Sequence, residues 1–402
     1  MTSAWLAWRT TTRYRARSAL AMIGVAVISA LLFDMLLLSH GLVDSFADLL
    51  EHAGYDVRVL STEGVPLLRA PIPQAAELAV AVGQLPEVES VARVRFERAV
   101  VTTQGRPDVD VALLGTTATG THAAWTLLKG AELPNDPSLE RCPLIVAQRL
   151  ATAWALVPGS TVSIRATLPG RQSALPAVGC RVVGTADFLF ASADEYDVAT
   201  TMQGLREVKG GAADDEADLV LVASRPQAGP AAAVRAIAKL RPDLRVYSNE
   251  DVVAQFNRNG FAYFRQVSVV LSSMTVVFAF LLVGTLLTVS TNQRLGEIAA
   301  LRALGIGRPR IASMLLYESA LLVGGGGVLA LPLGGMLAFG LDRILRQMPG
   351  VPERLHFFVF APGALVLHLA LLAATAIIAA SYPIWLTARL PIAPTLRHEV
   401  VG

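Results

Sequence analysis

Charge is scarce in this chain. Only 16% of its 402 residues are Asp, Glu, Lys or Arg, whereas 53% are hydrophobic, a balance too apolar for an ordinary soluble protein. The net charge of +2 offers no strongly basic surface, which excludes nucleic acid as an expected partner. The shortage of charge therefore indicates a membrane protein.

Catalytic signatures are missing as well. No G-x-x-x-x-G-K-[ST] occurs, so the chain lacks the loop that holds nucleotide phosphates, and G-x-S-x-G, H-E-x-x-H and C-x-x-C are also absent. The six histidines show no metal-ligand spacing. We therefore expect no catalytic residue, cofactor or metal in this chain, and a membrane-anchored enzyme is the least favoured class.

Four charge-poor stretches are each long enough to cross a bilayer, which takes about 20 apolar residues. They predict transmembrane helices at residues 19–40, 267–291, 313–342 and 359–387. The first contains Asp34, and a carboxylate near the membrane centre costs about 2.5 to 3.5 kcal/mol unless it faces protein or water. Ser272 and Ser273 of the second stretch lie at the matching height. We expect them to donate hydrogen bonds to Asp34, a packing role favoured over a proton or substrate role.

The placement of arginine orients these helices. The segments that should lie in the cytoplasm carry Arg9, Arg13, Arg15 and Arg17 before the first helix, and Arg294, Arg302, Arg308 and Arg310 between the second and third. Residues 1–18 and the tail 388–402 are then cytoplasmic, as is the segment 292–312. Residues 41–266 form an extracytoplasmic domain, and a short outer loop at 343–358 holds three arginines against the rule.

The predicted domain at 41–266 has a mixed α/β pattern. Short β-rich runs such as 90–101 and 218–223 alternate with helical patterns such as 230–240. Breaks rich in proline and glycine indicate a smaller subdomain inserted at about residues 116–200. The fold class is therefore four transmembrane helices with a mixed α/β extracytoplasmic domain between helices 1 and 2.

Both cysteines of the chain, Cys142 and Cys180, fall in this domain. A disulfide between them is permitted in an oxidising compartment and would close a loop of about 40 residues, a stabilisation of about 3 to 4 kcal/mol. The alternative is two unpaired buried thiols. We favour the disulfide, because two cysteines outside the cytoplasm rarely both stay free.

Helical extensions flank the α/β domain. After the first span, apolar residues fall on one helical side: Leu42, Phe46, Leu49 and Leu50. Before the second span, Val252, Phe256, Asn259 and Tyr263 recur at helical spacing. This pattern predicts two helices that pair antiparallel as a stalk above the membrane. The alternative is that both helices simply pack against the α/β domain. In the third span, small residues recur every four positions and predict close helix packing: Gly326, Ala330, Gly334 and Ala338.

The segment QRLGEIAALRALGIGRPR, from Gln293 to Arg310, is the most specific in the chain. It predicts a short helix that ends at Gly305, before a new helix that starts near Pro309. Large apolar residues fall on one side and small ones on the other: Leu295, Ile298, Leu301 and Leu304 against Gly296, Ala299, Ala300 and Ala303. Each side should meet a surface, and the alternative is a helix lying on the membrane.

This segment, EIAALRALG followed by a basic helix start, resembles the coupling segment of the MacB/FtsX-like ABC transporter permeases. The family includes LolC/LolE-type lipoprotein-release permeases and DevC-type exporter permeases. Further similar stretches are AWRTTTRYRARSALAMIGVAV at the N-terminus, RVVGTADFLFASADEYD from Arg181 to Asp197, and the tail YPIWLTARLPIAPTLR. In that tail, Ile392 stands where the family normally has proline.

The resemblance implies a mechanotransmission permease of the bacterial cytoplasmic (inner) membrane. Two copies of a separate ABC ATPase would bind ATP and Mg beneath a permease dimer, whose second subunit is identical or related. ATPase closure would move the coupling helix, the stalk and the outer domain, so that a lipid-linked or peptide cargo is extracted or exported. A periplasmic adaptor or carrier and membrane lipids are further candidate partners.

The residues that the resemblance assigns to ATPase coupling are Arg294, Glu297, Ile298, Ala300, Leu301, Arg302, Ala303, Leu304 and Gly305. We expect the small-residue side of this helix to meet the ATPase, with Glu297 and Arg302 at its rim. The alternative function is an FtsX-like signalling permease, which would activate an extracytoplasmic cell-wall hydrolase without transport. Cargo and the choice between homodimer and heterodimer stay open.

Overall fold

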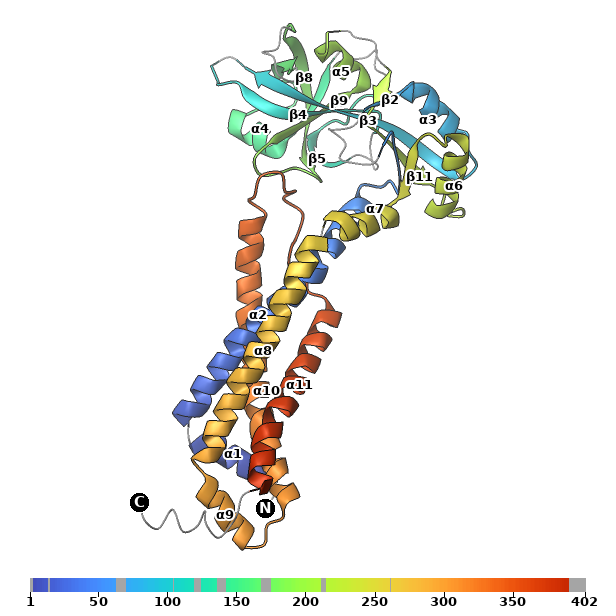
Figure 1. Ribbon diagram of the computed structural model, residues 1–402. Coiled ribbons are helices and arrows are strands. Elements are labelled where there is room, and N and C mark those ends of the chain that lie inside the picture. Colours follow the sequence, from blue (N-terminus) through green and yellow to red (C-terminus); the bar gives the residue numbers. More distant parts are fainter. Residues whose placement is uncertain are drawn as a thin grey trace. The chain divides into compact units, whose positions relative to one another are not determined.

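The computed structural model describes residues 3–13, 15–62, 70–103, 105–118, 124–135, 142–167, 175–210, 215–260 and 262–389. The chain divides into two compact units. The helical unit comprises Met1–Leu42, Phe261–Arg343 and Phe357–Gly402, and the α/β unit comprises Val43–Gly260 and Ile344–His356. Figure 1 labels the elements of both units.

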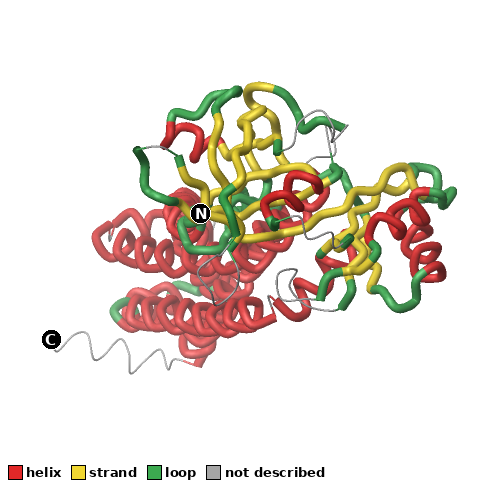
Figure 2. Tube along the Cα trace, turned by 90° about the horizontal axis from the view of Figure 1, so that it is seen from above, coloured by secondary structure: helices red, strands yellow, loops and turns green. Residues whose placement is uncertain are grey.

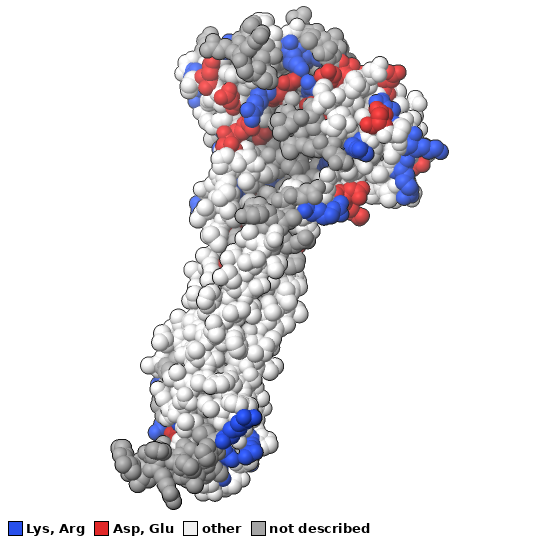
Figure 3. Space-filling view, in the orientation of Figure 1, with Lys and Arg blue, Asp and Glu red and all other residues white. Residues whose placement is uncertain are grey.

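The helical unit is built from α1 (Ser3–Arg13), α2 (Arg15–His52), α8 (Ala262–Asn292), α9 (Leu295–Ala303), α10 (Arg308–Leu345) and α11 (Pro362–Arg389). Among the described residues, α2, α8, α10 and α11 are long and apolar enough to cross a membrane. In Figure 3 the helical unit shows few charged side chains along most of its length. The prediction of four apolar helices is confirmed.

The stripe of small residues on α10 packs against α2. A Cβ atom added at Gly326 would lie 2.6 Å from Val25 Cγ1, and one added at Gly334 would lie 3.3 Å from Phe33 Cδ1. Ala330 and Ala338 on the same stripe are buried. The two helices therefore approach more closely than larger side chains would allow.

The α/β unit contains short helices and a mainly antiparallel sheet. Its strands are β1 (Val57–Leu60), β2 (Ile72–Pro73), β3 (Val88–Thr102), β4 (Val109–Thr116), β5 (Trp125–Gly130), β6 (Pro143–Ala147), β7 (Thr161–Ala166), β8 (Val178–Phe188), β9 (Tyr196–Thr201), β10 (Glu216–Ala217), β11 (Leu219–Ser224) and β12 (Arg245–Ser248). Its helices are α3 (Ala75–Gly83), α4 (Gln148–Trp154), α5 (Met202–Val208), α6 (Pro230–Leu240) and α7 (Asn249–Gln255), followed by a π-helical turn at Phe256–Gly260.

In the described part of the chain, ten strands form one sheet in the order β12-β1-β11-β3-β4-β9-β6-β8-β5, with β7 paired to β3 and β8. The pairs β4–β9 and β6–β8 are parallel. Figure 2 shows these strands in yellow. Strands β2 and β10 form a separate pair.

Two hydrophobic cores lie along this sheet. One contains Val57, Val220 and Ile237, beneath α3 and α6. The other contains Leu144 and Leu150, near α4 and α5. The 15-residue strand β3 contributes to both, so a single sheet runs through the whole unit. An inserted subdomain at about residues 116–200 stays a prediction, because the second core also takes residues from outside that range.

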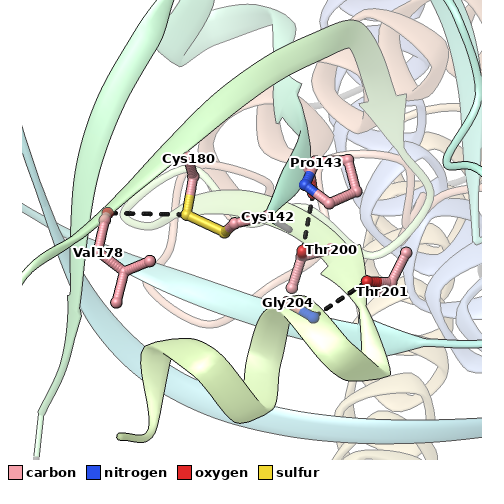
Figure 4. Close-up of a disulfide and its surroundings, with 7 residues drawn as sticks. All are labelled: Cys142, Pro143, Val178, Cys180, Thr200, Thr201 and Gly204. Carbon is pink, nitrogen blue, oxygen red and sulfur yellow. Dashed lines mark hydrogen bonds between the residues drawn. A yellow bond between two sulfur atoms is a disulfide. The ribbon is translucent and has the colours of Figure 1, made fainter. Parts of the chain in front are cut away.

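A disulfide joins Cys142 and Cys180 (Figure 4). Cys142 precedes β6 and Cys180 lies in β8, so the bond links two neighbouring parallel strands. The backbone nitrogen of Arg181 also donates to the Cys142 carbonyl, at 3.0 Å. Beside it, the buried hydroxyl of Thr200 donates to the Pro143 carbonyl at 2.7 Å. The disulfide thus reinforces hydrogen bonds that already fix this edge of the second core.

Candidate functional site

The segment between α8 and α10 folds as its sequence predicts. Helix α9 ends at Ala303, and the Gly305 backbone adopts a φ of +87°, a left-handed conformation that favours glycine. The Gly305 nitrogen donates to the Arg302 carbonyl at 3.1 Å, which closes the last turn. Helix α10 begins three residues later, with Pro309 as its second residue.

The predicted division of α9 into a large side and a small side is wrong. Gly296, Ile298 and Ala299 are buried together, and Ile298 packs against Ile311 and Leu315 of α10. The small residues Gly296 and Ala299 thus serve packing within the chain. Position on a helical wheel could not reveal this, because it does not say which neighbour each side meets.

The exposed side of α9 combines residues from both predicted groups. It carries Glu297, Ala300, Ala303 and Leu304. The Leu304 side chain is 81% exposed, the highest value among the large exposed hydrophobic side chains of the described chain. Glu297, Ala300 and Leu304 follow the i, i+3, i+7 spacing of one helical face. We call these four residues the outer face of α9.

Arg294 faces its own chain instead of a partner. Its Nη1 lies 3.4 Å from Glu318 Oε2 in α10, and its Nε lies 3.1 Å from Glu297 Oε2. Ser290 Oγ of α8 donates to the other Glu318 oxygen at 3.1 Å. Because the Arg294 side chain is 10% exposed and that of Glu318 is 3% exposed, this group is a buried ion pair that ties the start of α9 to α8 and α10.

The other end of α9 is tied to α11. Arg302 Nη1 donates to the Thr387 carbonyl at 3.3 Å. Leu301 and Arg302 are partly buried beside this contact. Both ends of α9 are thus hydrogen-bonded to neighbouring helices.

A polar joint holds the helical extensions where they enter the α/β unit. The Asn249 side-chain nitrogen donates to the Leu50 carbonyl at 3.3 Å and to the Tyr55 carbonyl at 3.1 Å, and Asn249 accepts a hydrogen bond from Arg58. Ser248 and Asp251 form a capping box that starts α7.

One aromatic pair joins the described parts of the two extensions, and an antiparallel stalk stays a prediction. The Phe46 and Phe256 rings are stacked 4.0 Å apart, and Leu49 and Leu50 are buried. Asn259 and Tyr263 fall outside the described side chains. The contact between Phe46 and Phe256 joins α2 to the π-helical turn that precedes α8.

The loop between α10 and α11 docks on the α/β unit, which the sequence alone did not predict. Arg149 Nη1 lies 3.0 Å from Glu353 Oε1 of the loop and 2.9 Å from the Ser192 carbonyl. The Gly350 nitrogen donates to Asp194 Oδ1 at 2.9 Å, and Arg354 pairs with Asp187. Arg354 is one of the three outer-loop arginines that broke the positive-inside rule, and its acidic partner Asp187 lies far from it in the sequence.

Asp197 lies beside this dock with its Oδ2 atom shielded and without a hydrogen-bond partner among the described residues. Burial raises the pKa of this carboxyl from 3.8 to about 7. The neighbouring Glu195 and Glu353 carboxylates raise it further, whereas the Arg149 guanidinium lowers it. The dock therefore contains one carboxyl that titrates near neutral pH.

Asp34 is buried in the helical unit, but its predicted hydrogen bonds are wrong. Ser273 Oγ donates to the Val269 carbonyl of its own helix at 2.7 Å, and both Asp34 oxygens lack a partner among the described residues. Ser268, about one turn from Ser272, donates a hydrogen bond to the Met35 carbonyl of α2 at 2.8 Å. The helices are offset by about one turn from the assumed register, and Asp34 faces Gly334 of α10.

Two family models match different parts of the chain. Residues 18–240 match the MacB-like periplasmic core domain, which covers more than half of the chain, and residues 269–392 match the FtsX-like permease C-terminal model. The chain belongs to the MacB/FtsX-like ABC transporter permeases. Family membership and the four apolar helices fit a multi-pass protein of the inner membrane.

The permease is 30% identical over 135 residues to an uncharacterized ABC transporter permease protein of Mycobacterium tuberculosis. That match covers 33% of this chain and 15% of the length of the relative. Similar solved structures include the periplasmic region of MacB from Actinobacillus actinomycetemcomitans (12% identity, 53% of this chain and 98% of that one, TM-score 0.39). Another is the extracellular domain of the noncanonic ABC-type transporter YknZ from Gram-positive bacteria (12%, 48% and 98%, TM-score 0.34).

Proposed function

We propose that this permease carries ATP-driven motion from a separate cytoplasmic ATPase to its extracytoplasmic α/β unit, and thereby extracts or exports a lipid-linked or peptide cargo. The observation that carries the proposal is the outer face of α9. Leu304, which is 81% exposed directly after α9, extends the exposed surface of Ala300 and Ala303, and together they offer a partner protein an apolar surface to cover. The ATPase is the partner that family membership supplies.

The outer face has the composition of a small docking element. Leu304 offers an aliphatic anchor, Ala300 and Ala303 permit close backbone approach, and Glu297 offers a charge at the rim. Glu297 also contacts Arg294, so its geometry is fixed by the buried ion pair with Glu318. A partner that grips this face would therefore meet a preformed surface.

The route onward follows the chain. Helix α8 is continuous from Ala262 to Asn292 and leads directly into α9. The π-helical turn before α8 contains Phe256, whose ring stacks on Phe46 of α2. Helix α10 begins just after α9 and leads to the loop that holds Glu353 against Arg149. Motion of α9 can thus reach the α/β unit by two separate connections.

Replacement of Leu304 tests whether the outer face of α9 binds the ATPase. Leu304→Ser should lower co-purification of the ATPase from membranes about tenfold or more, because loss of an interface anchor typically costs about 2 kcal/mol. Glu297→Lys should weaken binding in a salt-dependent manner. Met348→Ser is the matched control, since Met348 is also an exposed large apolar residue, 46% exposed, but lies in the loop after α10.

If Leu304→Ser keeps full ATPase binding and full coupled activity, α9 is an interfacial helix and the coupling assignment is wrong. Purification of the intact complex in gentle detergent would also identify its second permease and any adaptor. Activation of a cell-wall hydrolase without movement of any cargo would overturn transport in favour of signalling.

A further inference from the structure

Two tryptophan side chains are exposed on helix α1. Trp5 is 42% exposed and Trp8 is 59% exposed, whereas Ala7, which points away from both on the helix, is fully buried in the helical unit. Helix α1 is thus held to the unit by one side and presents its two indole rings on the other. Large apolar side chains exposed next to each other mark a surface that contacts a partner.

The charge around these rings is of one sign. Residues 1–33 contain four arginines and neither an acidic residue nor a lysine. Arg9 is exposed, and its guanidinium lies 5.3 Å from the centre of the Trp5 ring. The exposed side of α1 therefore combines aromatic rings with positive charge. Its complement is a surface that is anionic and lies over an apolar layer, as a bilayer with anionic phospholipids does.

The threonines of α1 donate to their own helix. Thr11 Oγ1 donates to the Ala7 carbonyl at 2.9 Å, and Thr12 Oγ1 donates to the Trp8 carbonyl at 3.0 Å. A hydroxyl that donates to a carbonyl of its own helix does not need a water molecule as acceptor. Helix α1 can therefore lie in the partly dehydrated boundary between bilayer and water.

The depth of α1 follows from the packing of the long helices. Ala21 of α2 and Ala379 of α11 belong to one hydrophobic cluster, and Phe33 contacts His368, so α2 and α11 run in opposite directions. Helix α2 begins six residues before Ala21, and Trp385 follows Ala379 by six residues. At about 1.5 Å per residue, the start of α2 and Trp385 both lie about 9 Å beyond this cluster.

Trp385 belongs to a group that is typical of a membrane–water boundary. Tyr382 and Trp385 are about half exposed, and the Arg389 guanidinium lies 4.4 Å from the Trp385 ring. Aromatic rings and arginines in this arrangement lie at the depth of lipid headgroups. Helix α2 begins two residues after α1 ends, and Figure 1 shows α1 turned aside from α2. Helix α1 therefore leaves α2 at headgroup depth.

We propose that α1 lies on the bilayer surface and gathers anionic phospholipids around its exposed side. The rings of Trp5 and Trp8 would lie among the headgroups, and the Arg9 guanidinium would donate hydrogen bonds to lipid phosphates. A zwitterionic lipid is disfavoured, because its positive group would meet arginine without a compensating acid in this part of the sequence. Since α1 leads into α2, the contact would fix the height at which α2 enters the bilayer.

Tryptophan fluorescence tests this proposal, because the chain has five tryptophans. In Trp385→Phe, Trp5 and Trp8 remain in α1, and Trp125 and Trp154 remain in the α/β unit. The full-length variant is placed without ATPase in nanodiscs that hold equal amounts of phosphatidylglycerol and phosphatidylcholine. One of the two lipids carries bromine on its acyl chains, which quenches indole rings that contact it. Further replacement of Trp5 and Trp8 by Phe gives the background to be subtracted.

We expect quenching to give an apparent affinity for phosphatidylglycerol at least about fivefold above that for phosphatidylcholine, as expected of one arginine near a membrane surface. Bromine close to the headgroup should quench more than bromine close to the methyl end of the chain. Arg9→Gln should lower the preference several-fold. Arg308→Gln is the matched control, since Arg308 is an exposed arginine at the start of α10, outside α1.

Equal quenching by the two lipids, or equal losses in Arg9→Gln and Arg308→Gln, would overturn the proposal. Quenching that does not fall when Trp5 and Trp8 are replaced would show that α1 lies away from the bilayer, which overturns it too. Loss of the α1 quenching when ATPase is added would show that this side of α1 is a protein contact, with the same consequence. Because lipid preference is measured without ATPase, failure here is distinct from failure of the coupling function.

Discussion

At the scale of single residues, Asp197 gives this permease a defined dependence on pH. Burial raises the pKa of its carboxyl to about 7, so between about pH 4 and 7 the folded protein holds a proton that the unfolded chain releases. Stability from this group is complete below pH 4 and is lost as the pH rises through 7. The full pKa difference corresponds to about 4 kcal/mol, and partial exposure reduces our expectation to about 2 kcal/mol.

Asp197→Asn should therefore stabilise the α/β unit at pH 8 and leave it unchanged at pH 4. Hydrogen exchange of β9 in the full-length protein measures this. Asp194 provides a control of opposite sign, because the Gly350 backbone hydrogen bond lowers its pKa and its stabilisation is lost as the pH falls. Asp194→Asn should thus speed exchange most at pH 8. Equal effects of both variants at both pH values would contradict the assignment.

Asp34 raises a different question, because its carboxyl is buried among helices without a described partner. A packing role predicts that Asp34→Asn leaves ATP-driven activity largely intact, since the amide keeps the shape of the site beside Gly334. ATPase stimulation and cargo release in the assembled complex measure this. Loss of activity in a complex that still assembles would favour a proton or substrate role instead.

At the scale of elements, the pair Arg294 and Glu318 decides how α9 sits on its neighbours. Arg294→Met should destabilise the helical unit by about 3 to 5 kcal/mol, because it leaves the Glu318 carboxylate buried without its partner. The double variant Arg294→Met, Glu318→Met should recover much of that loss. Thermal unfolding in detergent measures both, with Arg310→Met as an exposed control. Equal stability of the single and double variants would contradict an ion pair.

The disulfide is the second element-scale prediction. Peptide mapping without reduction should recover Cys142 joined to Cys180, and the double serine variant should lose about 3 to 4 kcal/mol of stability in the α/β unit. Ready alkylation of both thiols without a reductant would contradict the bond. Labelling only from the cytoplasmic side would contradict the proposed topology too.

The sequence predicted the features that depend on neighbouring residues, and it did not predict contacts between residues far apart in the chain. Apolar length predicted α8, α10 and α11, and glycine chemistry predicted the end of α9 at Gly305, because these depend on neighbouring residues alone. Arg294 contacts Glu318, 24 positions away, and Arg149 contacts Glu353, 204 positions away. A local sequence pattern does not say how two distant segments align, so it could not predict either contact. The one-turn error at Asp34 has the same origin.

At the scale of the whole molecule, the loop that docks on Arg149 should matter for coupling. Arg149→Met breaks the contacts with Glu353 and the Ser192 carbonyl, so motion of α10 would reach the α/β unit less completely. We expect ATPase binding to be unchanged while coupled transport falls several-fold. Arg241→Met is a suitable control, because Arg241 pairs with its near neighbour Asp243 away from the dock. If transport is unchanged in Arg149→Met, the motion would have to reach the α/β unit through α8 and the stalk instead of through the loop after α10.

The chain passes between its two units four times, at residues 42/43, 260/261, 343/344 and 356/357. Two of these passages enter the sheet at β1 and β12, and the other two enclose the loop that docks beside β8 and β9, toward the other end of the strand order. In the proposed mechanism, tension between these attachments would load the ladders from β1 to β8 sideways, so the mechanical strength of those ladders would limit the force that the permease delivers.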